Sequence, residues 1–359
     1  MSPTRLLAPL LLLALPHVPD AAAGQEAAGR TELHRVRGER VAVYNPVGRV
    51  TLRTIEGAAV EVEATRQGPD AGQLRFETGP HGGRETLRVV FPEDRILYRP
   101  EGTSGKSTSQ MHVRENGTFH DDVGPRGRRR LEIRNHGEGF EGHADLAVGL
   151  PRGQRFELFL GSGHVSVTNV EGDLRVDTGS ANIVAAEVSG KILLDTGAGA
   201  VSVTGARGEV NVDTGSGAVT ARSVEGAKLS IDTGSGGVVV HDVKVEELDV
   251  DTGSGAIQVD GAETTKLRLD TGSGSVTASL LRPFHEAVID TGSGNISLEL
   301  HPEQGASFEL DTGSGNLQVD LPHEITRKGR RERAGTLGDG AGRLRVDTGS
   351  GNIKLGKKA

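Results

Sequence analysis

The chain has 359 residues, of which 35% are hydrophobic and 3% aromatic, and it contains 53 glycines. This composition argues against a thick aromatic core and favours a thin core of small β-branched residues with many tight turns. The formal net charge of −8 argues against a nucleic-acid partner, and the absence of cysteine excludes disulfides, thiolate catalysis, zinc–thiolate sites and a lipid-modified cysteine.

Residues 1–23 have the features of a secretory signal peptide. Arg5 precedes an apolar run from Leu6 to Leu15 that is too short to span a bilayer, and Ala21-Ala22-Ala23 provides a small-residue cleavage pattern. No second stretch is apolar enough for a transmembrane segment. We therefore expect an exported protein, periplasmic or extracellular at the cell surface, whose mature N-terminus lies near Gly24.

Residues 24–100 predict an N-terminal β region or cap with irregular strands. Tyr44-Asn45-Pro46-Val47-Gly48 resembles a degenerate first copy of the repeat that dominates the rest of the chain, with apolar residues at its four core positions: Val41, Val43, Val50 and Leu52. Residues 101–130 are polar and rich in Gly, Ser and Arg, and they predict a long loop or disordered insert.

Residues 131–359 are organised by the tripeptide Asp-Thr-Gly, which occurs nine times. Its aspartates are Asp177, Asp195, Asp213, Asp232, Asp251, Asp270, Asp290, Asp311 and Asp347. The spacing is 18–21 residues until the last gap of 36, which is either two periods or one period plus an insertion. Residues 322–342, within this gap, form a second polar insert rich in Arg.

The apolar residues keep fixed positions relative to each Asp. They stand one and three residues before it, and six and eight residues after it. Alternation with a period of two on both sides of a Gly-rich turn predicts two short strands, each with one buried face. Without helical periodicity, the repeat predicts an all-β, single-chain parallel β-solenoid (β-helix) with 18–21-residue coils and D-T-G-S-G turns, stacked about 4.8 Å apart. In this register Val219 faces inward between Val201 and Val238, and Thr220 faces water.

The D-T-G-S-G turn suggests two roles for its Asp. We expect the carboxylate to cap the turn by accepting hydrogen bonds from the next two or three amides. Alternatively, the row of carboxylates, about 4.8 Å apart, collects divalent cations such as calcium. The glycine two residues after each Asp is present in all nine copies, which indicates a positive φ angle or close packing of turns.

Other motifs are better explained without catalysis. Asp-Thr-Gly-Ser resembles an aspartic-protease signature, but that chemistry needs two carboxylates in one cleft, not nine in a row. Gly137–Gly142 matches a dinucleotide fingerprint without a following helix, and Gly105-Lys106-Ser107 lacks the P-loop's first glycine. His120-Asp121-Asp122 could hold a metal, although a polar loop explains it better. We therefore assign no catalytic, cofactor-binding or metal-binding residue.

Two basic clusters stand in the polar inserts. The first comprises Arg126 with Arg128–Arg130, and the second is Arg327-Lys328-Gly329-Arg330-Arg331. Such runs are typical of solvated loops, and the functional alternative is contact with anionic polymers of the cell envelope.

The C-terminal two thirds resembles the "putative adhesin" family of bacterial β-strand-repeat envelope proteins, a domain of unknown function. The resemblance begins at Leu150-Pro151-Arg152-Gly153, includes Gly161–Val167 and Val170–Leu174, continues through every D-T-G-S-G copy and ends at Gly351–Leu355. It covers residues 145–359 well and residues 40–100 loosely. It implies a parallel β-solenoid at the cell envelope and no known catalytic residues.

The leading hypothesis is a non-enzymatic, exported envelope protein, an adhesin or surface-presenting β-solenoid that offers a rigid surface to an unidentified polymer or protein partner. One alternative is a structural scaffold that self-associates through its ends, like the bactofilin polymers. Another is a polysaccharide-active β-helix enzyme, but such enzymes use aromatic platforms and long loops, which the coils between residues 160 and 320 lack.

Overall fold

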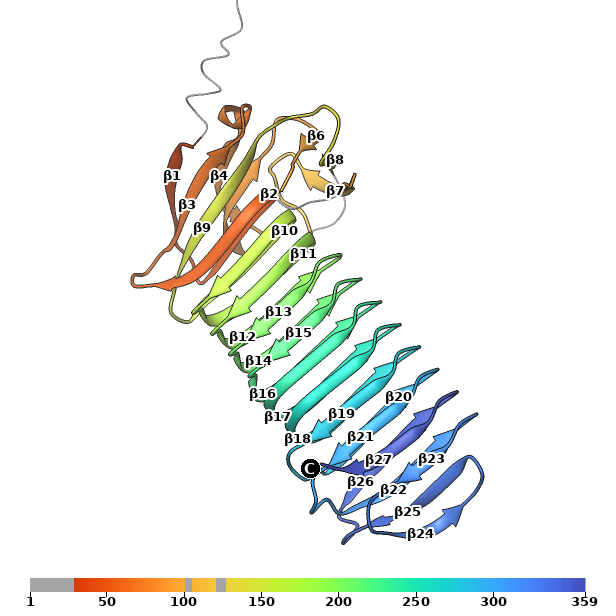
Figure 1. The fold of residues 1–359 in the computed structure, drawn as a ribbon. Coiled ribbons are helices and arrows are strands. Elements are labelled where there is room, and N and C mark those ends of the chain that lie inside the picture. The colour runs from red at the N-terminus through yellow and green to blue at the C-terminus, as the bar shows by residue number, and fades with distance from the viewer. Residues whose placement is uncertain (1–28, 101–104, 121–126, 359) are drawn as a thin grey trace, which may run out of the picture.

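The computed structural model describes residues 29–100, 105–120 and 127–358, and within them the chain is all-β, with 27 strands and one short 3-10 helix, η1 (Ala71–Gln73). The expected signal peptide at residues 1–23 lies outside the described residues. One sheet of 24 strands runs along an elongated rod, and a sheet of three strands lies beside its N-terminal end (Figure 1). In the described ranges, no helix is long and apolar enough to cross a membrane.

Most of the rod is a solenoid-like stack of parallel strands. In each repeat a leading strand enters the D-T-G turn and a trailing strand leaves it, and each pairs with its equivalents in the repeats on either side. Leading-strand Val210, for example, pairs with Ile192 and Leu229. The stack comprises β10 (Gln154–Thr168), β11 (Glu171–Ala186), β12 (Ser189–Thr196), β13 (Val201–Thr204), β14 (Arg207–Thr214), β15 (Val219–Arg222), β16 (Glu225–Thr233), β17 (Val238–Thr252), β18 (Ile257–Thr271), β19 (Val276–Leu280), β20 (Glu286–Thr291), β21 (Ile296–Leu300), β22 (Ala306–Thr312), β23 (Leu317–Val319), β26 (Gly342–Thr348) and β27 (Ile353–Lys357). The all-β class and the parallel pairing are thereby confirmed.

The core is the thin column of aliphatic side chains that the alternation predicts. Val219 is fully buried and pairs in register with Val201 and Val238, whereas Thr220 is partly exposed. Stacking buries each apolar side chain against its equivalents above and below, so the stability of one repeat depends on its neighbours. The predicted register is therefore correct.

The N-terminal region closes one end of the stack. β2 (Arg40–Ile55) pairs in parallel with β10, and its four apolar residues stand opposite Phe156, Leu158, Val165 and Val167, which confirms the degenerate first copy. β5 and β9 pair with the other edge of β2, and antiparallel strands cover them further. This region comprises β1 (Thr31–Val36), β2, β3 (Val60–Gln67), β4 (Arg75–His81), β5 (Arg84–Val90) and β9 (His143–Pro151).

Part of the expected loop over residues 101–130 is ordered in strands. β6 (Arg95–Leu97), β8 (Arg128–Arg134) and β7 (Thr108–Arg114) form a separate sheet, here called the small sheet. Met111 and Val113 are buried on it, a short alternation that the surrounding polar residues obscure in the sequence. Arg129 is not simply solvated, because its guanidinium donates to Asp94 Oδ1 and to the carbonyl of Phe91, each at 2.5 Å. Arg126 lies outside the described residues.

The far end of the stack is not in chain order. β26 pairs with β20 on one side and β22 on the other, and β27 lies between β21 and β23. The repeat of Asp347 therefore lies between those of Asp290 and Asp311. The expected insert at residues 322–342 supplies a hairpin of β24 (His323–Lys328) and β25 (Glu332–Leu337), which pairs antiparallel with β22 and covers the end. The gap of 36 residues is thus one period plus an insertion.

Candidate functional site

The nine D-T-G aspartates form one row along the edge of the stack. Each pairs in register with the next, from Asp177 to Asp290, and Asp347 follows before Asp311. Burial and the neighbouring carboxylates raise the pKa of four of them above the ordinary Asp value: Asp195, Asp213, Asp251 and Asp290. Equally spaced carboxylates on a straight edge do not form the paired, shared-proton site of an aspartic protease.

The turn is capped by Thr, not by Asp as expected from the sequence. Thr252 Oγ1 accepts a hydrogen bond from the Gly255 amide at 3.0 Å and donates one to the Gly236 carbonyl of the preceding repeat at 3.1 Å. Thr214, Thr233 and Thr271 repeat this arrangement. Among the described residues, no turn amide donates to a D-T-G carboxylate. The reason is strand alternation, which points Thr inward and Asp outward.

The turn glycines are required by close stacking. A Cβ atom on Gly234, a D-T-G glycine, would lie 2.5 Å from the Gly215 carbonyl oxygen of the preceding turn. One on Gly236, the last glycine of the same turn, would lie 1.8 Å from the Gly217 carbonyl oxygen. None of the D-T-G glycines has a positive φ angle. Of the two expectations for these glycines, close packing of turns is therefore the correct one.

The Asp row ends where the small sheet covers the stack. In β10, the strand before the first D-T-G repeat, Phe159 stands where the later repeats have Asp. Its ring stacks on Tyr44 of β2 with 4.6 Å between the ring centroids, and both rings are buried. His120 follows the small-sheet strand β7, and its Nδ1 atom lies 3.1 Å from Oδ1 of Asp177, the first carboxylate of the row. Arg175 donates to the other oxygen of Asp177 at 3.0 Å. Asp177 therefore joins the stack to the segment that follows β7.

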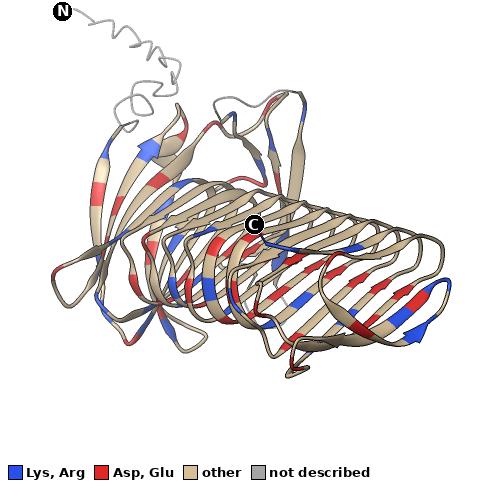
Figure 2. Ribbon diagram, turned by 60° about the horizontal axis from the view of Figure 1, so that its bottom comes forward, with Lys and Arg blue, Asp and Glu red and all other residues tan. Residues whose placement is uncertain are grey.

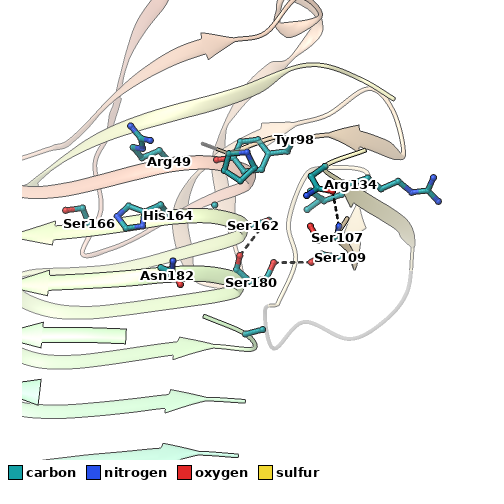
Figure 3. Close-up of a pocket in the computed structure, with 15 residues that line it drawn as sticks. Arg49, Tyr98, Ser107, Ser109, Arg134, Ser162, His164, Ser166, Ser180 and Asn182 are labelled. Atoms are coloured by element: carbon teal, nitrogen blue, oxygen red, sulfur yellow. Dashed lines mark hydrogen bonds between the residues drawn. The ribbon is translucent and has the colours of Figure 1, made fainter. Parts of the chain in front are cut away.

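A cleft of about 750 Å³ lies between the small sheet and the first repeats (Figure 3). β2 contributes Arg49, the connection after β6 contributes Tyr98, and the trailing half of β10 contributes His164. Five serines line it from both sides: Ser107, Ser109, Ser162, Ser166 and Ser180. Ser109 and Ser180 hydroxyls lie 3.1 Å apart across the junction.

The electrostatics of this cleft differ from those of the rest of the acidic chain. Its lining, taken over the described residues, contains no Asp or Glu. Burial, and secondarily the Arg49 guanidinium, lower the pKa of His164 below its ordinary value. Arg134 donates to Glu132 at 2.7 Å and its guanidinium points away from His164 (Figure 3). The Arg49 guanidinium has no ion-pair partner in the described chain, although the Asp145 carboxylate lies nearby and accepts a hydrogen bond from the Arg49 backbone amide at 2.8 Å. The cleft therefore offers one unpaired guanidinium beside hydroxyl groups and an imidazole.

The remaining motifs do not form sites in the structure. Gly137–Gly142 connects β8 to β9, so a strand follows it and not the helix that a dinucleotide fingerprint needs. His120 contributes to the contact with Asp177, and Asp121 and Asp122 lie outside the described residues. No group of three metal-ligating side chains occurs in the ranges that the structure describes.

Sequence reasoning did not find the cleft. Its walls come from β2, the small sheet, β10 and β11, and no local motif marks them. Arg49 and Asn182, on opposite ends of this set, are 182 − 49 = 133 residues apart in the chain. The one available signal was the degenerate copy Phe159-Leu160-Gly161-Ser162-Gly163, because an aromatic residue at the Asp position indicates that this turn is covered.

Comparisons with known proteins address the family. The model of the family described as Toastrack DUF4097 matches residues 140–356, well over half of the chain. No curated protein matches this sequence. A similar solved structure is that of a putative cell adhesion protein from Clostridium sporogenes, 11% identical, covering 92% of this chain and 100% of that chain with a TM-score of 0.18, which is too low to carry an argument about the site. The family match agrees with the repeat motifs, and the chain belongs to the Toastrack DUF4097 family.

Proposed function

We propose that this protein is a non-enzymatic, exported cell-envelope protein whose β-solenoid presents the cleft around Arg49 and His164 to an acidic envelope polymer. The observation that carries the proposal is the composition of the cleft: an unpaired guanidinium, an imidazole and five serines, without a carboxylate in the lining of described residues. Hydroxyl and amide groups suit the hydroxyls of a sugar, and a guanidinium suits a carboxylate or sulfate.

The same lining argues against hydrolysis of a polysaccharide. Glycoside hydrolysis uses two carboxyl groups on either side of the scissile bond, and the described residues that line the cleft supply none. The long rod, with its regular strand ladder, is suited to holding a binding surface rigidly.

A binding assay with short acidic oligosaccharides tests the proposal. Oligogalacturonate is the probe, and a neutral cello-oligosaccharide of similar length is the comparison, both measured by calorimetry. We expect Arg49→Gln to weaken oligogalacturonate binding about tenfold or more, since a charge-assisted hydrogen bond contributes about 1.5–3 kcal/mol. Arg53→Gln is the matched control, because Arg53 is an exposed arginine on the same strand, β2, outside the cleft. Equal effects of the two substitutions, or tighter binding of the neutral sugar, would contradict the proposal.

Export is tested separately by sequencing the N-terminus of the protein recovered from cells. We expect it near Gly24, and recovery of intact Met1 would contradict the proposal of an exported protein.

A further inference from the structure

The far end of the rod carries a concentration of positive charge that the cleft does not use. Residues 323–345 contain seven Lys or Arg and three Asp or Glu, 7 − 3 = +4, in a chain of net charge −8. The β24–β25 hairpin provides most of it and lies at the tip farthest from β1 (Figure 1). Figure 2 shows the same asymmetry, with Lys and Arg at the tip and both signs of charge along the adjoining strands.

Within the described hairpin, three basic side chains form no ion pair with a carboxylate. Arg327 pairs with Glu332, the only acid between residues 327 and 333. Lys328, Arg330 and Arg331 are exposed, and none has an ion-pair partner in the described part of the chain. The hairpin turn is closed by the Gly329 amide, which donates to the Glu332 carbonyl at 2.8 Å. The Thr312 amide donates to the Arg331 carbonyl at 2.9 Å, so the turn holds these cations at the far end of the rod, beside its last D-T-G turn.

Protection of a strand edge does not explain this arrangement. β24 pairs only with β25 and is the outermost strand, and charges on such a strand discourage edge-to-edge aggregation. Arg330 and Arg331, however, stand in the turn, where there is no ladder edge to protect. Charges of both signs would also serve protection, whereas this turn carries positive charge alone.

The shape of the tip indicates what kind of anionic partner fits it. A soluble polymer needs a groove along which to lie. A cleft of about 540 Å³ adjoins the hairpin, but Lys328, Arg330 and Arg331 are not in its lining, so these cations project from the hairpin turn and do not face a groove. Ile325 on β24 is also 43% exposed, one of few large apolar side chains so exposed among the described residues. Projecting cations on the same hairpin as an exposed apolar side chain match a planar surface of anionic headgroups with acyl chains beneath it.

We propose that the β24–β25 hairpin contacts an anionic lipid bilayer through Lys328, Arg330 and Arg331, with Ile325 at the headgroup boundary. The nine repeats from Asp177 to Asp311 rise about 4.8 Å each, so the rod holds the cleft roughly 40 Å from that bilayer. The inference goes beyond the proposed ligand of the cleft and does not require it.

Vesicle co-flotation of the full chain tests this contact. The probes are phosphatidylcholine vesicles with and without phosphatidylglycerol, at low and at physiological salt. We expect binding only to the vesicles that contain phosphatidylglycerol, weakened by salt. Lys328→Gln combined with Arg330→Gln and Arg331→Gln should lower partitioning by roughly 100-fold, about fivefold for each cation near an anionic surface.

The matched control removes the same charge elsewhere. Arg37, Arg53 and Arg222 are exposed, have no ion-pair partner in the described chain and lie away from the tip. Changing all three to Gln should leave partitioning within a few-fold of the parent, and an equal loss would show that net charge alone matters. Thermal melting establishes that both variants are folded, and Arg330→Lys with Arg331→Lys should retain binding.

Two further outcomes would overturn the inference. One is parent protein that does not float with phosphatidylglycerol vesicles but does bind soluble oligogalacturonate through the three hairpin cations. The other is that the triple Gln variant of Lys328, Arg330 and Arg331 floats like the parent but self-associates more. That result would mean that the cations only protect the exposed edge of β24 from pairing with other chains. Arg49→Gln should not change flotation, so failure of the cleft proposal and failure of this one are distinguishable.

Discussion

Replacing Asp251 by Asn should stabilise the protein at neutral pH. Asp251 stands in register between Asp232 and Asp270, and its pKa is raised by burial first and then by these two carboxylates. Two unit charges about 4.8 Å apart repel by about 1 kcal/mol in water. Two neighbours set an upper value of about 2 kcal/mol, which solvent exposure and the nearby Arg268 reduce to about 1 kcal/mol. Asn has nearly the same shape, and the turn keeps its Thr252 hydrogen bonds.

The expected gain in melting temperature is about 1–2 °C at pH 7 and low salt, because the entropy of unfolding grows with chain length and each kcal/mol shifts a long chain less. A carboxyl group whose pKa is raised on folding contributes stability that is present below its unfolded pKa, about 3.9, and is lost as pH rises through its folded pKa. The advantage of Asp251→Asn should therefore shrink as pH falls from 7 towards 4, and also as salt is added. Calorimetric or fluorescence melting across pH measures both trends.

Glu303→Gln is the matched control, because it removes one exposed carboxylate that has no ion-pair partner in the described chain. It should leave the melting temperature nearly unchanged. A loss of stability in Asp251→Asn at pH 7, or a gain that does not depend on pH, would refute the electrostatic argument. A rise of several degrees on adding calcium, lost in Asp232→Asn combined with Asp251→Asn, would instead favour a cation-binding row.

Three further substitutions test the packing of the stack by thermal or chemical melting. Val219→Asp should cost several kcal/mol because it buries an unpaired charge, whereas Thr220→Asp should cost little; equal losses would mean that the register is wrong. Gly236→Ala should be strongly destabilising because its Cβ would meet the preceding turn at 1.8 Å, whereas Gly237→Ala meets its nearest atom at 3.7 Å and should be tolerated. Thr252→Val should cost about 1–3 kcal/mol and Thr252→Ser much less, and equal costs would argue against the hydrogen-bonding role.

The sequence predicted the parts of the fold that repeat locally. The strand alternation around each Asp was sufficient to predict which residues pair between neighbouring repeats. The same alternation also indicates which turn residue faces the core. The residue before Asp faces inward, so Asp must face outward and Thr inward. Applied to the turn, this rule indicates that Thr makes the capping hydrogen bonds, as the structure shows.

Long-range arrangements were harder to predict, because pairings between distant segments depend on details outside any one repeat. The small sheet and its cleft are examples. The placement of the last repeat has a signal in retrospect: three copies read D-T-G-S-G-N, and their asparagines are Asn295, Asn352 and Asn316. The Asn352 backbone N–H donates to Asn295 Oδ1, and the Asn316 backbone N–H donates to Asn352 Oδ1, each at 2.9 Å. Neighbouring repeats share this ladder although they are not neighbours in sequence.

The position of the last repeat has a consequence for synthesis. A chain that emerges from its N-terminus can add most repeats one by one, each pairing with the one made just before. Residues 306–319 cannot pair with the repeat made just before them, residues 286–300. In the folded rod β26 and β27 lie between these two repeats, and β26 and β27 are made last. Completion of the rod must therefore wait for residue 357. A chain that stops near residue 340 lacks β26 and β27, so β20 to β23 have lost the strands that they pair with in the complete rod and cannot keep that arrangement.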